Sequence, residues 1–116
     1  MKLLYPELKS LISGVSDGDY DFENQLTTAI YRGLNEFREK YEEASLDKNQ
    51  EIIQQIKYKL KPTLSLFGFN HISTELQNGQ EILDSSGFDS AFESHKSDLF
   101  FLLEAAICES KSLIRK

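Results

Sequence analysis

The segment that decides the fold covers residues 57–68 and reads KYKLKPTLSLFG. Its apolar side chains continue a series that begins upstream and recurs every three or four positions. That series consists of Ile53, Ile56, Leu60, Leu64 and Phe67. Because an α-helix has 3.6 residues per turn, this spacing gathers the side chains on one face. The segment is therefore predicted to form an amphipathic helix with one buried and one exposed side.

Three other parts of the chain repeat this helical period, and no run alternates polar and apolar residues as a strand would. Asp19 or Asp21, Asn70, and Ser90 with Glu93 are predicted to cap these helices, because their side chains can accept hydrogen bonds from free amides. The three apolar series are Phe22, Leu26, Ile30, Leu34, Phe37, Tyr41 and Ala44; Ile72, Leu76, Gly79 and Leu83; and Phe92, Leu99, Leu103, Ala106, Ser110 and Leu113.

Short polar stretches join these segments, including residues 13–19 and 85–87. Short connections between long amphipathic helices favour antiparallel neighbours. We therefore expect an all-α fold: an antiparallel up-and-down four-helix bundle preceded by a short extra helix from about Pro6 to Ser13. A chain of 116 residues fits a single domain that covers residues 1–116.

The exposed side of the segment at 57–68 has Tyr58 at its centre. On a helical wheel, Gln54, Lys61 and Ser65 lie within roughly 60° of Tyr58, and Gly68 lies within roughly 80°. Lysines at 57, 59 and 61 form a local basic cluster in an acidic chain. Such a strip beside an aromatic side chain suits the close approach of an acidic partner. The alternative is a plain solvated surface, with Gly68 ending the helix. The candidate partner-binding residues are Tyr58, Lys61, Ser65, Gly68, Lys57 and Gln54.

The composition argues against several classes of function. The chain has 13 Lys plus Arg against 19 Asp plus Glu, a net charge of -6, which disfavours binding to nucleic-acid phosphates. No apolar run approaches the roughly 20 residues of a membrane span, and no secretory signal is visible, so we expect a cytoplasmic protein without membrane contact. One cysteine, Cys108, and two histidines, His71 and His95, lack the spacing of metal ligands. We expect neither a metal site nor a cofactor.

The run from Tyr58 to Gly68 resembles the core motif of the histidine-containing phosphotransfer (HPt) domains of two-component phosphorelays. That motif has His, any residue, an aliphatic residue, Lys and usually Gly, then a small residue and a Gly at intervals of three. The matching positions are Tyr58, Lys59, Leu60, Lys61, Pro62, Ser65 and Gly68. Residues 18–22 also resemble the Gly-Asp-x-x-Phe sequence that begins the first long helix of many such domains. The resemblance covers most of the chain and implies the HPt helical bundle.

Tyr58 stands where this family has its phosphorylated histidine. Imidazole nitrogen is nucleophilic near pH 7, whereas a phenol has an ordinary pKa of about 10 and would form a far more inert phosphate ester. We therefore expect no reversible phosphotransfer at Tyr58, and no enzymatic activity from it. The resemblance then implies a degenerate, or pseudo-HPt, module that binds a response-regulator receiver domain or a histidine kinase as a monomer. Pro62 is a second departure, because it replaces the usual glycine.

Two alternatives remain open at this stage. The protein could be an active phosphotransfer protein that uses another histidine, His71 or His95, although neither is followed three residues later by the lysine of the motif. It could also be an unrelated helical interaction module in which the match to the motif is a coincidence. A solvated or partly packed side chain is the simpler interpretation of each histidine.

Overall fold

The computed structural model describes residues 4–114, and this part of the chain is all-helical, without a strand. Its five helices are α1 (Leu8–Ser16), α2 (Tyr20–Leu46), α3 (Gln50–Leu66), α4 (Asn70–Ser85) and α5 (Ser90–Leu113). Helices α2 to α5 each follow one of the four periodic segments of the sequence. The all-α prediction is therefore confirmed. The predicted N-terminal helix exists, but it begins two residues later and ends three residues later than expected.

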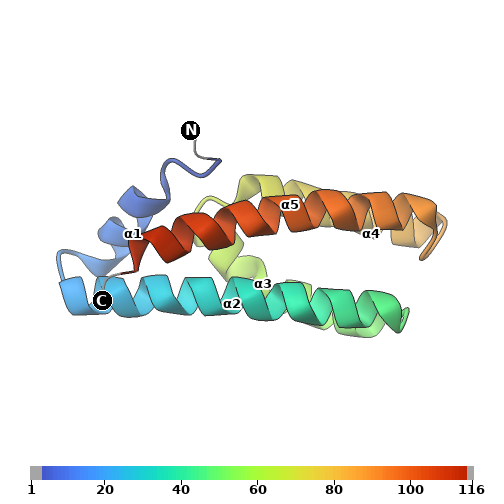
Figure 1. Ribbon diagram of the computed structural model, residues 1–116, viewed down its shortest axis with the longest axis horizontal. Coiled ribbons are helices and arrows are strands. Elements are labelled where there is room, and N and C mark those ends of the chain that lie inside the picture. The colour runs from blue at the N-terminus through green and yellow to red at the C-terminus, as the bar shows by residue number, and fades with distance from the viewer. Residues whose placement is uncertain (1–3, 115–116) are drawn as a thin grey trace.

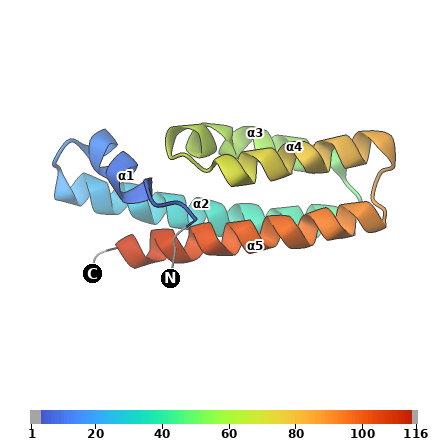
Figure 2. The ribbon, with the colours of Figure 1, turned by 90° about the horizontal axis from the view of Figure 1, so that it is seen from above.

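The long helices pack in a cycle in which α2 contacts α3 and α5, and α4 also contacts α3 and α5. Figure 2 shows α3 and α4 side by side on one side of the molecule, with α2 and α5 on the other. The molecule is elongated, with extents of 47 × 28 × 21 Å. Short connections join consecutive helices, so helices that are neighbours in sequence are also neighbours in space (Figure 1).

Helix α1 occupies the end of the molecule that α3 and α4 do not reach. Helices α2 and α5 have 27 and 24 residues, against 17 and 16 for α3 and α4. At a rise of roughly 1.5 Å per residue, α2 extends about 15 Å beyond α3. Helix α1 packs against α2 and lies beside this extension, at the left of Figure 2. The extra helix thus covers apolar surface that the shorter pair leaves open.

The apolar series predicted from the sequence form the core. The series of α3 and α4 are buried throughout, and so are those of α2 from Ile30 to Ala44 and of α5 from Phe92 to Ser110. Phe22 is an exception at 43% exposed, because the first turn of α2 lies beyond the ends of α3 and α4. Leu26 and Leu113 are only partly buried.

One of the three helix-cap predictions is confirmed, and the other two are wrong. Asp19 caps α2, where its carboxylate accepts a hydrogen bond from the Phe22 N–H at 3.0 Å. At α5 the cap is Asp89, one residue before the predicted capping box, so the Ser90–Glu93 pair lies inside the helix. Asn70 is the first residue of α4, and the cap position is held by Phe69. Phe69 is fully buried, so packing of this side chain overrides the capping preference there.

Candidate functional site

The predicted exposed face of α3 is exposed in the structure. Tyr58 lies near the middle of the helix with 81% of its surface exposed. Lys61 and Ser65, one and two turns further on, are exposed as well. The opposite face of the same helix carries the buried aliphatic side chains, which hold α3 against its neighbours. The helical wheel therefore placed Tyr58, Lys61 and Ser65 correctly.

Two of the candidate residues are tied to α4 rather than standing free. The side chains of Gln54 and Lys57 both donate to the side-chain amide oxygen Oε1 of Gln80, with the Lys57 Nζ at 2.7 Å. The Gln80 amide in turn donates to Asp84 at 2.9 Å. Burial lowers the pKa of Lys57, and the charge of Asp84 opposes that shift. Gln54 and Lys57 thus fix the edge of the site and join α3 to α4.

A groove runs between α3 and α4 beside Tyr58, with a volume of about 700 Å³. We call it the α3–α4 groove. Tyr58 and Lys61 form part of one wall, and Leu64 and Leu76 contribute apolar surface to it. The remaining lining residues are Gln54, Gln55, Lys57, Ser73 and Gln77. The groove gives the exposed aromatic ring and the lysine a concave neighbouring surface that a partner can fill.

The basic cluster of three lysines separates into three different environments. Lys57 is bonded to Gln80 of α4, as described above. Lys59 turns the other way, with its Nζ 3.6 Å from Glu36 of α2. Lys61 makes no hydrogen bond or ion pair within residues 4–114. Of the three lysines, Lys61 is therefore the one whose ammonium group has no partner within the described residues.

Gly68 does not lie on the exposed strip of α3, and the wheel position predicted for it is wrong. The helix ends at Leu66, and Gly68 follows with a φ of +69°, a left-handed conformation that favours glycine. A Cβ on Gly68 would also come within 3.2 Å of Leu11 in α1. Gly68 therefore ends α3 and lets α1 approach, and its contact with a partner stays a prediction.

Sequence reasoning missed an exposed apolar row on α3. Pro62 and Leu66 follow Tyr58 at intervals of four residues, so the three side chains lie above one another on the helix. All three are exposed, with Leu66 at 54%. The spacing of four residues between these side chains was visible in the sequence and could have revealed the row. This row adds a hydrophobic edge to the polar positions Lys61 and Ser65.

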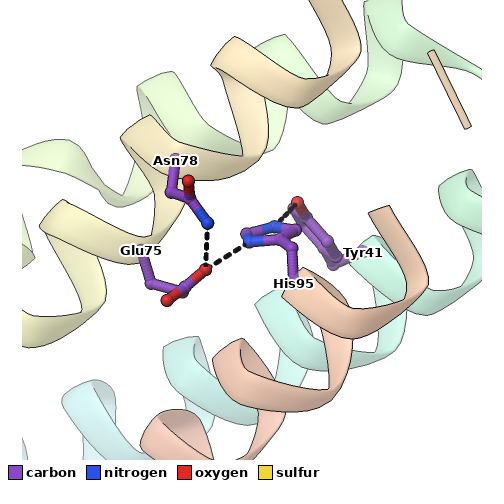
Figure 3. Close-up of polar contacts among 4 residues, drawn as sticks. All are labelled: Tyr41, Glu75, Asn78 and His95. Carbon is purple, nitrogen blue, oxygen red and sulfur yellow. Dashed lines mark hydrogen bonds and ion pairs between the residues drawn. The ribbon is translucent and has the colours of Figure 1, made fainter. Parts of the chain in front are cut away.

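The two histidines lie in very different places. His71 is exposed in the first turn of α4, and its ring packs edge-on against Tyr5, with 5.9 Å between centroids. His95 is 1% exposed and bonded through both ring nitrogens. Its Nε2 lies 2.7 Å from the Tyr41 hydroxyl, and its Nδ1 lies 2.7 Å from Glu75 Oε2 (Figure 3). The interpretation of His95 as solvated or partly packed is wrong.

A cluster of Tyr41, His95, Glu75 and Asn78 joins α2, α5 and α4 (Figure 3). Tyr41 and His95 are buried, Glu75 is partly buried, and Asn78 is exposed. Burial raises the pKa of Tyr41, and the charge of Glu75 raises it further, so the phenol keeps its proton. That proton can be donated to Nε2 of a neutral imidazole, whose Nδ1–H then donates to Glu75. The Asn78 amide donates to the same carboxylate oxygen at 3.0 Å. We call these four residues the His95 cluster.

The order hydroxyl, imidazole, carboxylate is also that of hydrolytic triads. Here, however, the Tyr41 hydroxyl belongs to a side chain that is 1% exposed. A substrate cannot reach it without opening of the helices. The same burial and hydrogen bonding withhold both His95 nitrogens from a phosphoryl donor. The arrangement is suited to holding three helices together.

Gly79 makes room for the His95 cluster. It is buried in α4, and a Cβ at this position would clash with the His95 imidazole. Two signals in the sequence mark these positions as unusual, although neither signal pairs the two residues with each other. Gly79 interrupts an otherwise aliphatic series, and the α5 series skips the turn between Phe92 and Leu99 where His95 lies.

Comparison with known proteins identifies no relative, because no family model, curated protein or solved structure matches this chain. Within residues 4–114, no helix has both the length and the apolar character needed to cross a membrane. In the same range, no three His, Cys, Asp or Glu side chains are grouped as metal ligands would be.

Proposed function

We propose that this protein is an HPt-like module of two-component signalling that binds a receiver domain or a histidine kinase without carrying phosphate. In this proposal α2 to α5 form an antiparallel up-and-down four-helix bundle of the HPt type, with α1 as an addition. One observation carries the proposal. The motif position of the phosphorylated histidine is held by Tyr58, which is 81% exposed in the middle of α3, beside the unpaired Lys61 and the exposed Ser65.

The chemistry of this face suits an acidic protein surface. Lys61 can donate charge-assisted hydrogen bonds to carboxylates of the acidic pocket that the family resemblance implies for a receiver. Tyr58 offers a large aromatic surface with few rotatable bonds, which is typical of interface centres. Pro62 and Leu66 supply exposed apolar surface along one edge. Together, these residues place an exposed apolar row and the unpaired ammonium group of Lys61 on one helix.

The absence of phosphotransfer follows from the chemistry of the available groups. A phenol in place of imidazole would give an inert ester rather than a labile phosphoramidate. His95, the alternative acceptor in α5, has both nitrogens engaged inside the core. His71 is exposed but packs on Tyr5 and lies outside the α3 face. These observations favour a binding module over an active phosphotransfer protein.

The experiment that tests the binding part compares affinities of charge-reversed variants for the receivers and kinases of the same organism. Lys61→Glu is expected to weaken binding by about tenfold or more, because it places a carboxylate against an acidic surface. Lys9→Glu makes the same change in α1 and is expected to leave affinity unchanged. Equal affinity of Lys61→Glu and the unmodified protein would favour an unrelated helical interaction module.

The absence of transfer is tested separately with labelled phosphate. The unmodified protein is expected to gain no acid-labile label from phosphorylated receivers or kinases. Tyr58→His is expected to gain such a label if the surrounding geometry of the motif is intact. Label on the unmodified protein that disappears in His71→Gln or His95→Gln would instead establish an active phosphotransfer protein.

A further inference from the structure

A glycine stands at position 33 in the middle of α2, although no contact within residues 4–114 requires one there. Glycine destabilises a helix interior relative to alanine. Gly33 nevertheless lies 13 residues from either end of a 27-residue helix. Its backbone is not in the left-handed region, and a Cβ built on it would meet nothing within 4 Å. No neighbouring atom within residues 4–114 therefore requires a glycine at position 33.

Gly33 opens onto a cavity of about 150 Å³ between α2 and α3, on the other side of α3 from the α3–α4 groove. Its floor is formed by the buried side chains of Phe37, Ile56 and Leu60. An apolar cavity of about 150 Å³ can hold a group the size of benzene, whereas sites for small-molecule ligands start at about 300 Å³. The size therefore matches one apolar side chain of a partner.

The rim of this cavity is positively charged in a chain whose net charge is -6. Two ammonium groups share a single carboxylate there: Lys40 lies 2.9 Å and Lys59 lies 3.6 Å from Glu36. Lys59 has the longer contact, and its side chain is 76% exposed. A carboxylate from outside can pair with Lys59 without disturbing the contact between Lys40 and Glu36.

We propose that this cavity is a second interaction site, which receives an acidic polypeptide segment with one apolar side chain of leucine or phenylalanine size. The apolar side chain enters between α2 and α3 above Phe37, and a neighbouring carboxylate pairs with Lys59. The missing side chain at Gly33 lets the segment approach α2 closely. The site uses neither Tyr58 nor Lys61, so it does not depend on the proposed phosphorelay function.

The test uses NMR titration of the ¹⁵N-labelled protein with the peptide Ac-Glu-Glu-Leu-Glu-Glu-NH₂. Saturable shifts are expected at Gly33, Lys59 and Thr63. Two matched peptides separate the components: one has Gly in place of Leu, and the other has Gln in place of each Glu. Each matched peptide is expected to bind at least about tenfold more weakly than the original peptide. The Gly peptide loses the buried side chain, and the Gln peptide loses the negative charges.

Variants locate the site. Gly33→Leu fills the cavity and is expected to reduce the affinity for the peptide by about tenfold or more. Gly14→Leu is its matched control, because Gly14 also lies in a helix with nothing within 4 Å but does not line the cavity. Lys59→Glu removes one exposed ion pair with Glu36, a contact that contributes little to stability, and is expected to abolish the preference for the acidic peptide. Unsaturable shifts, or equal binding by the unmodified protein and by Gly33→Leu or Lys59→Glu, would overturn the proposal.

Discussion

The exposed face of α3 and the His95 cluster make opposite use of tyrosine and histidine. On α3, Tyr58 is 81% exposed at the position that the proposed HPt resemblance gives to a phosphorylated histidine. Inside the molecule a histidine is present, but Tyr41 and Glu75 occupy both of its nitrogens. Tyr58 is accessible but lacks a nucleophilic nitrogen, whereas His95 has such a nitrogen but is not accessible. Phosphotransfer needs both properties in one place, and neither of these two regions combines them, so the comparison favours recognition over transfer at both.

The largest effect is expected where the His95 cluster is packed most tightly. Gly79→Ala would force a Cβ into the His95 imidazole. We expect the free energy of unfolding to fall by about 3 kcal/mol, because overpacking a core without room to relax is strongly destabilising. Urea denaturation monitored by circular dichroism measures this change.

The control for that substitution is Gly33→Ala, which makes the same change in a helix where the new Cβ meets nothing within 4 Å. It is expected to leave stability unchanged or to raise it by up to ~1 kcal/mol through helix propensity. In a His95→Ala background, Gly79→Ala should cost less than about 1 kcal/mol, because the clashing ring is gone. The same cost in both backgrounds would refute the contact between Gly79 and His95 as its cause.

The second prediction applies one chemical change to both regions. Tyr41→Phe removes the hydroxyl that bonds His95 Nε2 and leaves a buried polar atom unpaired, so we expect a loss of about 2 kcal/mol. Tyr58→Phe removes an exposed hydroxyl and should change the free energy of unfolding by less than about 0.5 kcal/mol. Thermal and urea denaturation of the two variants provide the comparison.

The effects of the tyrosine variants on partner affinity should not follow their effects on the free energy of unfolding. Tyr41→Phe leaves the α3 face intact, so it should bind a receiver or kinase as well as the unmodified protein does while it remains folded. Tyr58→Ala removes the exposed ring and should weaken that binding. If Tyr41→Phe weakens binding while Tyr58→Ala does not, the two regions have been assigned the wrong roles.

The smallest predicted effect distinguishes lysines that the sequence groups together. Lys57→Ala removes the hydrogen bond to Gln80 and exposes apolar surface beneath a half-buried side chain, at a cost of about 1 kcal/mol. Lys61→Ala removes an exposed and unpaired side chain, so stability should change by less than about 0.5 kcal/mol. Denaturant titrations measure both, and a larger loss for Lys61→Ala would contradict the environments described for the two residues.

The sequence predicted the helices and most of the core, because burial imposes a period that survives in the order of residues. Ile53, Leu60 and Leu64 are buried where that period places them. The helical period gave a wrong position for Gly68, because the wheel assumes that the helix continues to this residue. Helix α3 ends at Leu66. Phe69 similarly displaced the predicted cap at Asn70 because packing outweighed capping.

Side-chain partners from other helices were beyond reach of the sequence. The lysines at 57 and 59 lie roughly 200° apart around α3, so a helical wheel separates their directions. Which partner each one meets, Gln80 or Glu36, depends on the packing of α4 and α2 against α3. The contact of Gly79 with His95 has the same origin, because it depends on the register between α4 and α5. Exposure of Tyr58 needed no such knowledge, and it was predicted correctly.

The most direct test of the central claim is a chemical-shift map of the ¹⁵N-labelled protein titrated with receiver domains from its own organism. The proposed function predicts saturable shifts centred on Tyr58, Lys61 and Ser65 for at least one receiver, with no acid-labile phosphate gained from its phosphorylated form. Binding that leaves these amides unshifted, the absence of binding to every receiver and kinase, or the appearance of acid-labile label would contradict it.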